Sequence, residues 1–319
     1  MNNINHELHE KGLISSQQYE FLEGIRTNKV VSLYFELRLV LYLGIMLLTG
    51  GLGYIAYQNM GSFGHIISML LIFAGIVGCF YFVNKQALPY SNAEVNINHP
   101  YFDYILILGA LLIIALFTYI TIYFSLIELI NVSTLVSAAL LLYFTYRYDN
   151  TALLSMGLVA FAATVGINIS PMNWATGELL QSSNLYVTAI LLGIGYYVVG
   201  HLSEQREIKA HFRFTYQNFG LMLYFVGLIS AIFISDFEVI FALWLLISAV
   251  AIGYFSWDKR EFLFFLYAVI SGYIAFTYLF YKMLDAIDAE TLMIFYVPFS
   301  CIGLVAYLII NKKHFTNER

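Results

Sequence analysis

Charged residues are scarce in this sequence. Only 11% of its 319 residues are Asp, Glu, Lys or Arg, whereas 61% are hydrophobic, and the mean hydropathy is +0.77. A soluble globular domain carries about 25% charged residues, because polar side chains must cover its surface. The shortage excludes a soluble protein with a large core. It indicates instead that much of the surface faces lipid.

Several kinds of functional motif are also missing. No long basic run is present, so the sequence has no electrostatic footprint for binding nucleic acid. The two cysteines, Cys79 and Cys301, each lie in an apolar run without a CxxC pattern, which favours buried thiols over a metal site or a disulfide. There is no HExxH motif, no Walker loop and no Ser/His/Asp arrangement. We therefore expect no metal, no cofactor and no catalytic residue, and a protein that is not an enzyme.

Long apolar runs fill most of the chain. A membrane helix needs about 20 mostly apolar residues, and backbone groups in lipid must be satisfied within the segment, so such runs are helices. The fold class that we predict is therefore all-α, a polytopic transmembrane bundle of about ten spans. The runs lie roughly at 37–57, 63–83, 103–124, 126–146, 150–168, 185–201, 214–235, 237–256, 261–284 and 291–310.

The basic residues predict the orientation of these spans, because Lys and Arg are retained on the cytoplasmic side of a membrane. With ten spans, fourteen of the fifteen Lys and Arg residues fall on one side, and Lys282 alone falls on the other. A missing or additional span would scramble this partition. We therefore expect both chain ends in the cytoplasm and a protein of the bacterial inner membrane, in contact with the lipid bilayer.

A polar stretch precedes the spans. It has the pattern of a helix start, with Ser15 and Gln18 placed as a capping box and Ile14 and Tyr19 as a hydrophobic staple. We predict a small cytoplasmic helical hairpin within residues 1–35, followed by a transmembrane domain over 36–311 and a cytoplasmic tail over 312–319. Residues 5–29 could dock a cytoplasmic protein partner, or they could rest on the membrane surface as an amphipathic anchor.

The beginning of the chain resembles a known family. The stretch "GLIS…Q…L" is followed by the glycine-rich span "FELRLVLYLGIMLLTGGLGYIAYQN", which contains Gly44, Gly50, Gly51 and Gly53. Over residues 8–85 this order resembles a bacterial family of multi-pass membrane proteins that is catalogued as a domain of unknown function. The family's Ala-x-Asn-Trp-like turn is replaced by "AYQNM", with Met60 in place of the aromatic residue. The resemblance implies a bacterial integral membrane protein, and it implies no activity, substrate or catalytic residue.

Two apolar stretches of the chain also resemble each other. "YLGIMLLTGGLGYIAY" resembles "NFGLMLYFVGLISAIF", with Gly44 matching Gly220 and Gly51 matching Gly227. This suggests that residues 37–146 and 214–310 form a parallel repeat, an arrangement that some transporters use. Chance matches are also common in such apolar sequence, so both interpretations stay open.

The spans contain no convincing buried charge, although an ionisable residue in lipid would mark a functional site. Paired glycines can break a helix near the membrane midplane, which makes Gly50 and Gly51 candidates for a substrate-lining segment. Internal polar residues can line a path or bond another helix, and the outer loop 168–184 could form a lid or a surface turn. Together these considerations give seven candidate substrate-lining or gating residues: Gly50, Gly51, Asn131, Asn168, Trp174, Glu178 and Asn218.

Two predicted cytoplasmic segments carry charges. In "YRYDN", Arg147 and Asp149 suggest a local ion pair with aromatic anchors. The segment "HLSEQREIKAHFRF" has the look of a short charged helix, on which His201 and His211 do not share a face and make a poor metal pair.

Three hypotheses for function follow, in this order. The first is a permease-like protein for a small uncharged or lipophilic solute, with a cavity near the midplane lined by the first and seventh spans. The second is a non-catalytic scaffold or sensor, a solid bundle whose hairpin recruits a partner. The third is an intramembrane enzyme acting on a lipid-linked substrate, with His, Asp or Glu side chains converging at one interface. The sequence does not identify a substrate, a partner or an oligomeric state.

Overall fold

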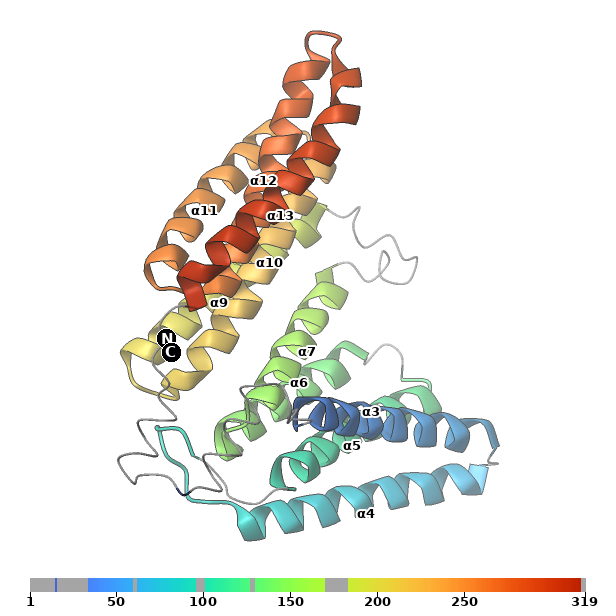
Figure 1. The fold of residues 1–319 in the computed structure, drawn as a ribbon. Helices are drawn as coiled ribbons and strands as arrows, with labels where there is room; N and C mark the ends of the chain where they lie inside the picture. The colour runs from blue at the N-terminus through green and yellow to red at the C-terminus, as the bar shows by residue number, and fades with distance from the viewer. Residues whose placement is uncertain are drawn as a thin grey trace. The chain divides into compact units, whose positions relative to one another are not determined.

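The computed structural model describes residue 15 and residues 34–59, 62–95, 101–126, 130–169 and 183–316. In these ranges the protein consists of helices and their connections, without a β-strand (Figure 1). The predicted hairpin of residues 1–35 lies almost entirely outside the described residues, as does most of the outer loop 168–184.

Each of the ten predicted apolar runs overlaps one described α-helix. The helices are α3 (Tyr34–Asn59), α4 (Ser62–Gln86), α5 (Phe102–Tyr123), α6 (Ile130–Tyr148), α7 (Thr151–Ile169), α9 (Ser183–Gln205), α10 (Arg213–Ile234), α11 (Glu238–Asp258), α12 (Phe262–Asp285) and α13 (Met293–Thr316). Short 3₁₀ turns at Ala210–Phe212 and Glu290–Leu292 precede α10 and α13.

Seven of the described helices are long and apolar enough to cross a bilayer: α4, α5, α9, α10, α11, α12 and α13. Shorter apolar stretches lie within α3 and α7, at Leu39–Gly51 and Thr151–Gly166. The outward side chains of helices this long and this apolar are solvated by lipid and not by water. The protein is therefore an all-α, membrane-embedded bundle.

The chain divides into two compact units, residues 1–72 and 73–319. In the first unit, α3 continues as one helix through Gly50 and Gly51, and the Thr49 hydroxyl donates hydrogen bonds back to the Ile45 and Met46 carbonyls. The predicted break of the helix at the paired glycines is therefore wrong. Two adjacent glycines lower helix propensity, but lipid offers no other partner for the backbone groups that a break would free.

In the second unit, α9 and α10 approach each other backbone to backbone. A Cβ atom added to Gly193 would lie 2.6 Å from the Tyr224 nitrogen, and one added to Gly220 would lie 2.8 Å from the Gly193 carbonyl oxygen. Gly200 and Gly227 are equally crowded. Small residues permit such close packing in membranes, where apolar side chains gain little by leaving lipid. Gly193 and Gly200 thus lie at the helix contact, whereas Gly195 faces open space.

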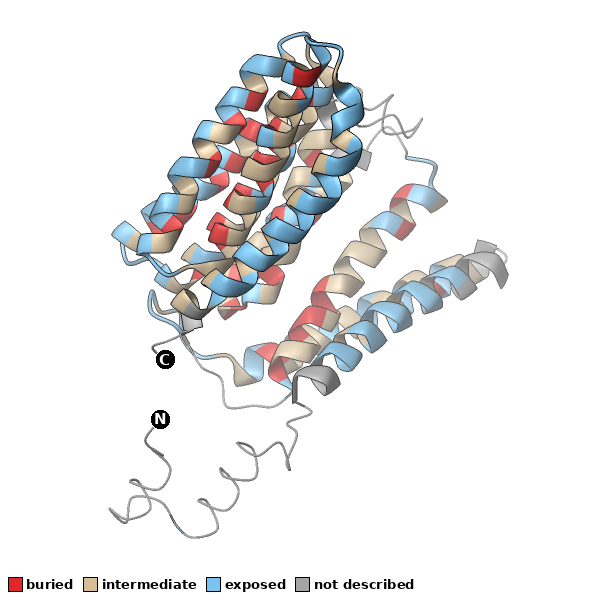
Figure 2. Ribbon diagram, turned by 45° about the horizontal axis from the view of Figure 1, so that its top comes forward, coloured by how far each residue is buried: buried red, intermediate tan, exposed pale blue. Residues whose placement is uncertain are grey.

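The core of this second unit lies between α9, α10, α11 and α12. Leu228, Leu245 and Ala275 are completely buried there, one from each of α10, α11 and α12. Figure 2 shows buried positions on the facing sides of these helices, whereas α13 is exposed along its length. At its end, α13 is held by the His314 imidazole, which stacks on the Trp257 indole with ring centroids 4.1 Å apart. Further along, α13 contacts α12 through the Tyr273 and Ser300 hydroxyls, 2.9 Å apart, and through the Phe280 and Tyr296 rings, and its other faces are left for lipid.

Candidate functional site

A groove runs along α10, between α9 and α11. One section of it has a volume of about 360 Å³ and is mostly apolar. The Tyr224 hydroxyl and the Ser248 hydroxyl lie in this section and share one hydrogen bond of 2.7 Å, in which either can be the donor. The residues that line it are Gly193, Ile194, Tyr197, Gly220, Leu221, Tyr224, Ser248, Ala251, Ile252 and Phe255.

A second section of about 310 Å³ continues the groove toward the ends of the helices that meet Arg213. Tyr197, Leu221, Ile252 and Phe255 line both sections, so the two form one continuous groove. This second section adds polar and charged side chains: His201, Gln217, Ser256, Lys259 and Glu261. The groove is therefore amphipathic along its length, with an apolar end in the middle of α11 and a polar end at the α11–α12 connection.

Helix packing explains why this groove exists. Close contact between α9 and α10 leaves α10 as a floor, and α11 packs on the other side of α10. Gly193 and Gly220 bring α9 and α10 into contact, and the small side chain of Ala251 on α11 leaves the space beside them unfilled. Sections of this volume fall within the roughly 300–1,000 Å³ of small-molecule sites.

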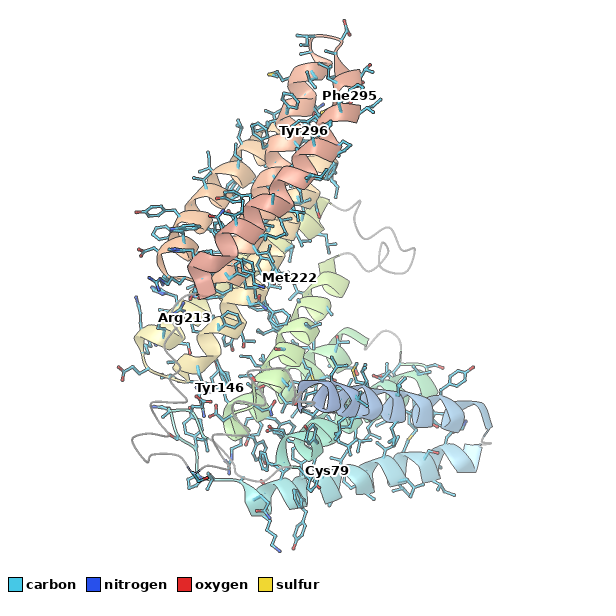
Figure 3. The ribbon with its side chains drawn as sticks, viewed as in Figure 1. Cys79, Tyr146, Arg213, Met222, Phe295 and Tyr296 are labelled. Carbon is cyan, nitrogen blue, oxygen red and sulfur yellow. The ribbon has the colours of Figure 1, made fainter. Side chains whose placement is uncertain are left out.

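At the polar end, one guanidinium joins three helix ends. Arg213, the first residue of α10, donates to Glu204 at the end of α9 over 2.7 Å and to Glu261 just before α12. Its Nε donates to the Gln217 amide oxygen over 3.0 Å. We call these four residues the Arg213 cluster. Figure 3 places Arg213 at the opposite end of the bundle from Phe295 and Tyr296, near the start of α13.

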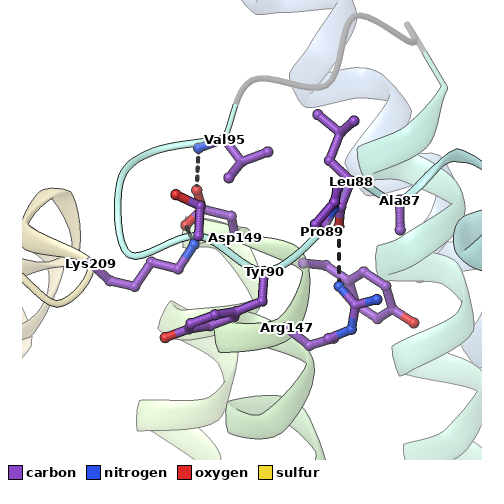
Figure 4. Close-up of a pocket in the computed structure, with 10 residues that line it drawn as sticks. Ala87, Leu88, Pro89, Tyr90, Val95, Arg147, Asp149 and Lys209 are labelled. Atoms are coloured by element: carbon purple, nitrogen blue, oxygen red, sulfur yellow. Dashed lines mark hydrogen bonds and ion pairs between the residues drawn. The ribbon is translucent and has the colours of Figure 1, made fainter.

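A second cluster lies deeper in the protein, where the α6–α7 turn meets the α9–α10 connection (Figure 4). The Asp149 oxygen Oδ1 is 2.9 Å from Lys209 Nζ and 2.7 Å from His211 Nε2. Oδ2 accepts a hydrogen bond of 2.5 Å from the Val95 backbone N–H. Asp149 and Lys209 are 3% and 1% exposed, and His211 is 20% exposed. Asp149, Lys209 and His211 form what we call the Asp149 cluster.

The backbone around this cluster is unusual. Asp149 and Lys209 have φ angles of 59° and 51°, in the left-handed region that residues other than glycine rarely adopt. The Lys209 N–H donates to the Asn92 carbonyl over 2.9 Å, and the Ser203 hydroxyl donates to the Lys209 carbonyl over 3.1 Å. The Lys209 ammonium also lies over the Tyr90 ring, 5.3 Å from its centroid. These contacts hold the lysine in place although its backbone conformation is unfavourable.

Two predictions about these segments are wrong. Arg147 does not pair with Asp149. It donates to the Leu88 carbonyl over 3.3 Å, because the left-handed turn at Asp149 directs that carboxylate toward the α9–α10 connection instead. The segment 201–214 is not one charged helix either: α9 ends at Gln205, and a turn and a 3₁₀ segment follow. Left-handed residues at Glu207 and Lys209 interrupt the helix.

Of the seven predicted site residues, the structure describes the surroundings of Gly50, Gly51 and Asn218. Asn218 accepts a hydrogen bond of 3.0 Å from the Tyr267 hydroxyl and so joins α10 to α12. Gly50 and Gly51 lie in the first unit. Asn131 and Asn168 belong to α6 and α7, but their side chains lie outside the described part, as do Trp174 and Glu178. Among the described residues, no group of His, Cys, Asp and Glu could hold a metal ion.

The groove residues were missed by sequence reasoning. In the sequence, Tyr197, Ile252 and Phe255 cannot be distinguished from lipid-facing side chains, because only the relative rotation of three helices brings them together. The glycines of α9 gave a partial signal, because they indicated where two helices touch. Lys259 was used only to orient the spans.

The chain matches no protein-family model, no curated protein and no solved structure. The resemblance of residues 8–85 to a family of unknown function stays a prediction, and the site has to be interpreted from its own geometry.

Proposed function

We propose that this membrane protein is a permease-like carrier that binds a lipophilic solute in the groove between α9, α10 and α11. One observation supports this most directly: the groove is continuous from an apolar end at Tyr224 and Ser248 to a polar end at Lys259 and Glu261. A solute with a hydrocarbon part would meet apolar side chains along the groove and water at its end.

The groove favours this proposal over a solid scaffold. Volume alone does not distinguish the groove, because a hollow of about 360 Å³ also lies between α11, α12 and Tyr307 of α13. The feature that supports a binding role over a scaffold is the continuity of this groove from an apolar end to a polar end. We expected the cavity to lie near the midplane and to be lined by the first and seventh spans. The groove does involve the seventh, α10, but its walls come from the neighbouring spans, α9 and α11.

The proposal includes a topology. We propose ten spans in the bacterial inner membrane, with both chain ends in the cytoplasm, so that the polar end of the groove faces the cytoplasm. In support, contacts join the connections that carry the predicted cytoplasmic charges: Val95 and Lys209 meet at Asp149, and Arg213 meets Glu261. Cysteine labelling at Trp174→Cys, in a chain lacking Cys79 and Cys301, should proceed from outside the cell. Labelling from inside only would overturn this topology.

Transport can be measured with the purified chain in lipid vesicles. The probe is a lysophospholipid that carries a nitrobenzoxadiazole fluorophore, and its movement between leaflets is followed by dithionite quenching. Vesicles with the protein should move the probe several-fold faster than empty vesicles. Equal rates in both would refute the proposed function.

A matched pair of substitutions on α11 makes this test specific. Ala251 lines the groove, and Ala251→Trp should fill it and return the rate to that of empty vesicles. Ile247 is 68% exposed and is not among the residues that line the groove. Ile247→Trp adds the same indole to the same helix and should leave the rate unchanged. If both variants behave alike, the groove is not the path.

A further inference from the structure

The apolar end of the groove is blocked by large side chains. Residues three or four positions apart lie on the same face of an α-helix. On each of the three helices, the position three or four residues beyond the last groove residue carries a large apolar side chain: Ile190 on α9, Leu228 on α10 and Leu245 on α11. The helix faces that line the groove therefore continue past its end, with different side chains on them.

These three side chains fill the space between the helices. Leu228 and Leu245 are completely buried, Ile190 is 5% exposed, and all three belong to one apolar core. We call them the end layer. Nearer the polar end, the lining includes small residues instead, namely Gly193, Gly220 and Ala251. The groove thus exists where the residues are small and stops where they are large.

A pair of aromatic rings closes the next turn. Tyr186 of α9 and Phe241 of α11 pack edge to face, with ring centroids 5.6 Å apart. Both lie four residues before a member of the end layer, Ile190 or Leu245, and so share its face. The two walls of the groove therefore meet each other here, and a chain lying in the groove has to stop at the end layer.

The opposite end of the groove is polar and balanced in charge. The carboxylates of Glu204 and Glu261 face Arg213. The exposed Lys259 supplies the second positive charge. Two negative and two positive groups favour neither an anionic nor a cationic head group. Selection by the groove has to come from its apolar stretch.

The apolar stretch is shorter than one leaflet of a bilayer. From Ser248 to Ser256, α11 rises by about 12 Å, because an α-helix advances 1.5 Å per residue. The hydrocarbon of a bilayer is about 30 Å thick, so one leaflet contributes about 15 Å. A hexadecanoyl chain, which fills a leaflet, is too long for this stretch. A dodecanoyl chain is about a quarter shorter and fits it.

The groove is also open to lipid along its side. Ile194, Tyr197 and Phe255 line it and are 42%, 41% and 61% exposed. A hydrocarbon chain can therefore enter from the bilayer without a prior opening of the bundle.

We infer that the groove measures the hydrocarbon chain of its solute and selects chains of about dodecyl length. The chain lies along Leu221, Ile252 and Phe255, and its terminal methyl group stops at the end layer. This inference rests on the proposed function, because it names the class of solute for the same groove. It adds that the length of the chain, and not the charge of the head group, decides which solute binds.

The experiment uses three uncharged monoacylglycerols that differ only in their chains: octanoyl, dodecanoyl and hexadecanoyl glycerol. Binding to the full-length protein in detergent micelles is measured by native mass spectrometry, at equal mole fractions of the ligands in the micelle. The wild-type protein should bind dodecanoyl glycerol roughly tenfold more tightly than hexadecanoyl glycerol, since each methylene group kept out of an apolar site costs a factor of about four in affinity.

Two substitutions on α11 should shift this preference in opposite directions. Leu245→Ala opens the next turn of the groove, about 5.4 Å, and should make hexadecanoyl glycerol bind at least as tightly as dodecanoyl glycerol. Ser248→Leu fills the last turn of the groove and should make octanoyl glycerol the preferred ligand. Leu243 is 47% exposed and does not line the groove, so Leu243→Ala should keep the wild-type preference.

The results separate the two proposals. Equal affinities for all three chains, together with loss of binding in Ala251→Trp, would show that the groove binds solutes and that the end layer does not measure them. Binding that persists in Ala251→Trp would place the site elsewhere and remove the main support of the proposed function.

Each variant is judged by the ratio of two ligands on the same protein, which a fraction of unfolded chain does not change. If Leu245→Ala does not fold, Ser248→Leu decides the matter, and an unchanged ratio in that variant would overturn the inference.

Discussion

The Asp149 and Arg213 clusters contain similar chemical groups in opposite proportions. In the Asp149 cluster one carboxylate faces two nitrogen bases, and its Asp149–Lys209 pair is at most 3% exposed. In the Arg213 cluster one guanidinium faces two carboxylates, and its ionic members are 21–38% exposed. Both fasten the α9–α10 connection to a neighbouring one, Asp149 to the α6–α7 turn and Glu261 to the α11–α12 turn.

Burial makes these two similar arrangements differ in energy. A charge that loses its partner in the interior stays desolvated and cannot recover its hydration, so the loss is large. A charge at a partly exposed site recovers water when its partner is removed, so the loss is small. We therefore expect the contacts of the Asp149 cluster to stay formed, and those of the Arg213 cluster to break at a small cost in free energy. Four substitutions test this difference.

Asp149→Asn should have the largest effect. The substitution keeps the shape of the side chain but leaves the Lys209 ammonium buried without a counter-ion. We expect the free energy of unfolding to fall by about 3–5 kcal/mol. Unfolding by SDS in mixed micelles, followed by circular dichroism, measures this loss. A loss below about 1 kcal/mol would contradict the structural role of the buried pair.

Lys209→Met should come next, with a loss of about 1–3 kcal/mol. Asp149 then keeps its contacts with His211 and the Val95 N–H, so its buried carboxylate still has hydrogen-bond partners. Combining Lys209→Met with Asp149→Asn removes both charges and should cost less than the sum of the two single substitutions. Additive losses in the same unfolding assay would mean that the two side chains do not interact.

Arg213→Gln should destabilise the protein by about 1–2 kcal/mol, because Glu204 and Glu261 lose a shared partner but remain in contact with water. Salt provides a control for the comparison. Raising the ionic strength should shrink the effect of Arg213→Gln, since exposed charges are screened, and should leave the effect of Asp149→Asn nearly unchanged. The same salt dependence in both variants would remove the distinction between the clusters.

Glu204→Gln should have the smallest effect, less than about 1 kcal/mol, because exposed ion pairs contribute little. Arg213 keeps Glu261 and the Gln217 amide in this variant. A loss as large as that of Arg213→Gln would show that Glu204, rather than Glu261, carries the interaction.

The positions of the helices were readable from the sequence, and the site was not. The requirement for about 20 apolar residues is strong enough that each predicted run overlaps a described helix. Tyr197, Leu221 and Phe255 meet only through the rotation of three helices about their axes. Membrane helices that are apolar all round give little sequence signal for that rotation.

The Asp149 cluster was hidden for a different reason. Arg147 is two residues from Asp149, and proximity along the chain suggested a local pair. The left-handed backbone at Asp149 turns its carboxylate toward Lys209, sixty residues further along the chain. Asp and Asn adopt this conformation more often than most residues, but still in a minority of cases, so "YRYDN" does not specify it. Contacts between distant segments that depend on one rare dihedral angle escape pattern-based prediction.

The glycine contact between α9 and α10 sets the mechanics of the groove. Because the Gly193 and Gly220 backbones are in contact, α9 and α10 cannot slide or separate without losing contact along both helices. They therefore move together as one rigid unit. Any widening of the groove must therefore come from the α11–α12 hairpin moving away from the α9–α10 pair, a hinge-like motion. The Tyr224–Ser248 bond crosses this boundary near its middle, whereas Arg213–Glu261 and Tyr267–Asn218 cross it toward the end where α10 and α12 begin. The hairpin is thus the part that would move, and these three bonds oppose its movement together with the buried core contacts of Leu228, Leu245 and Ala275.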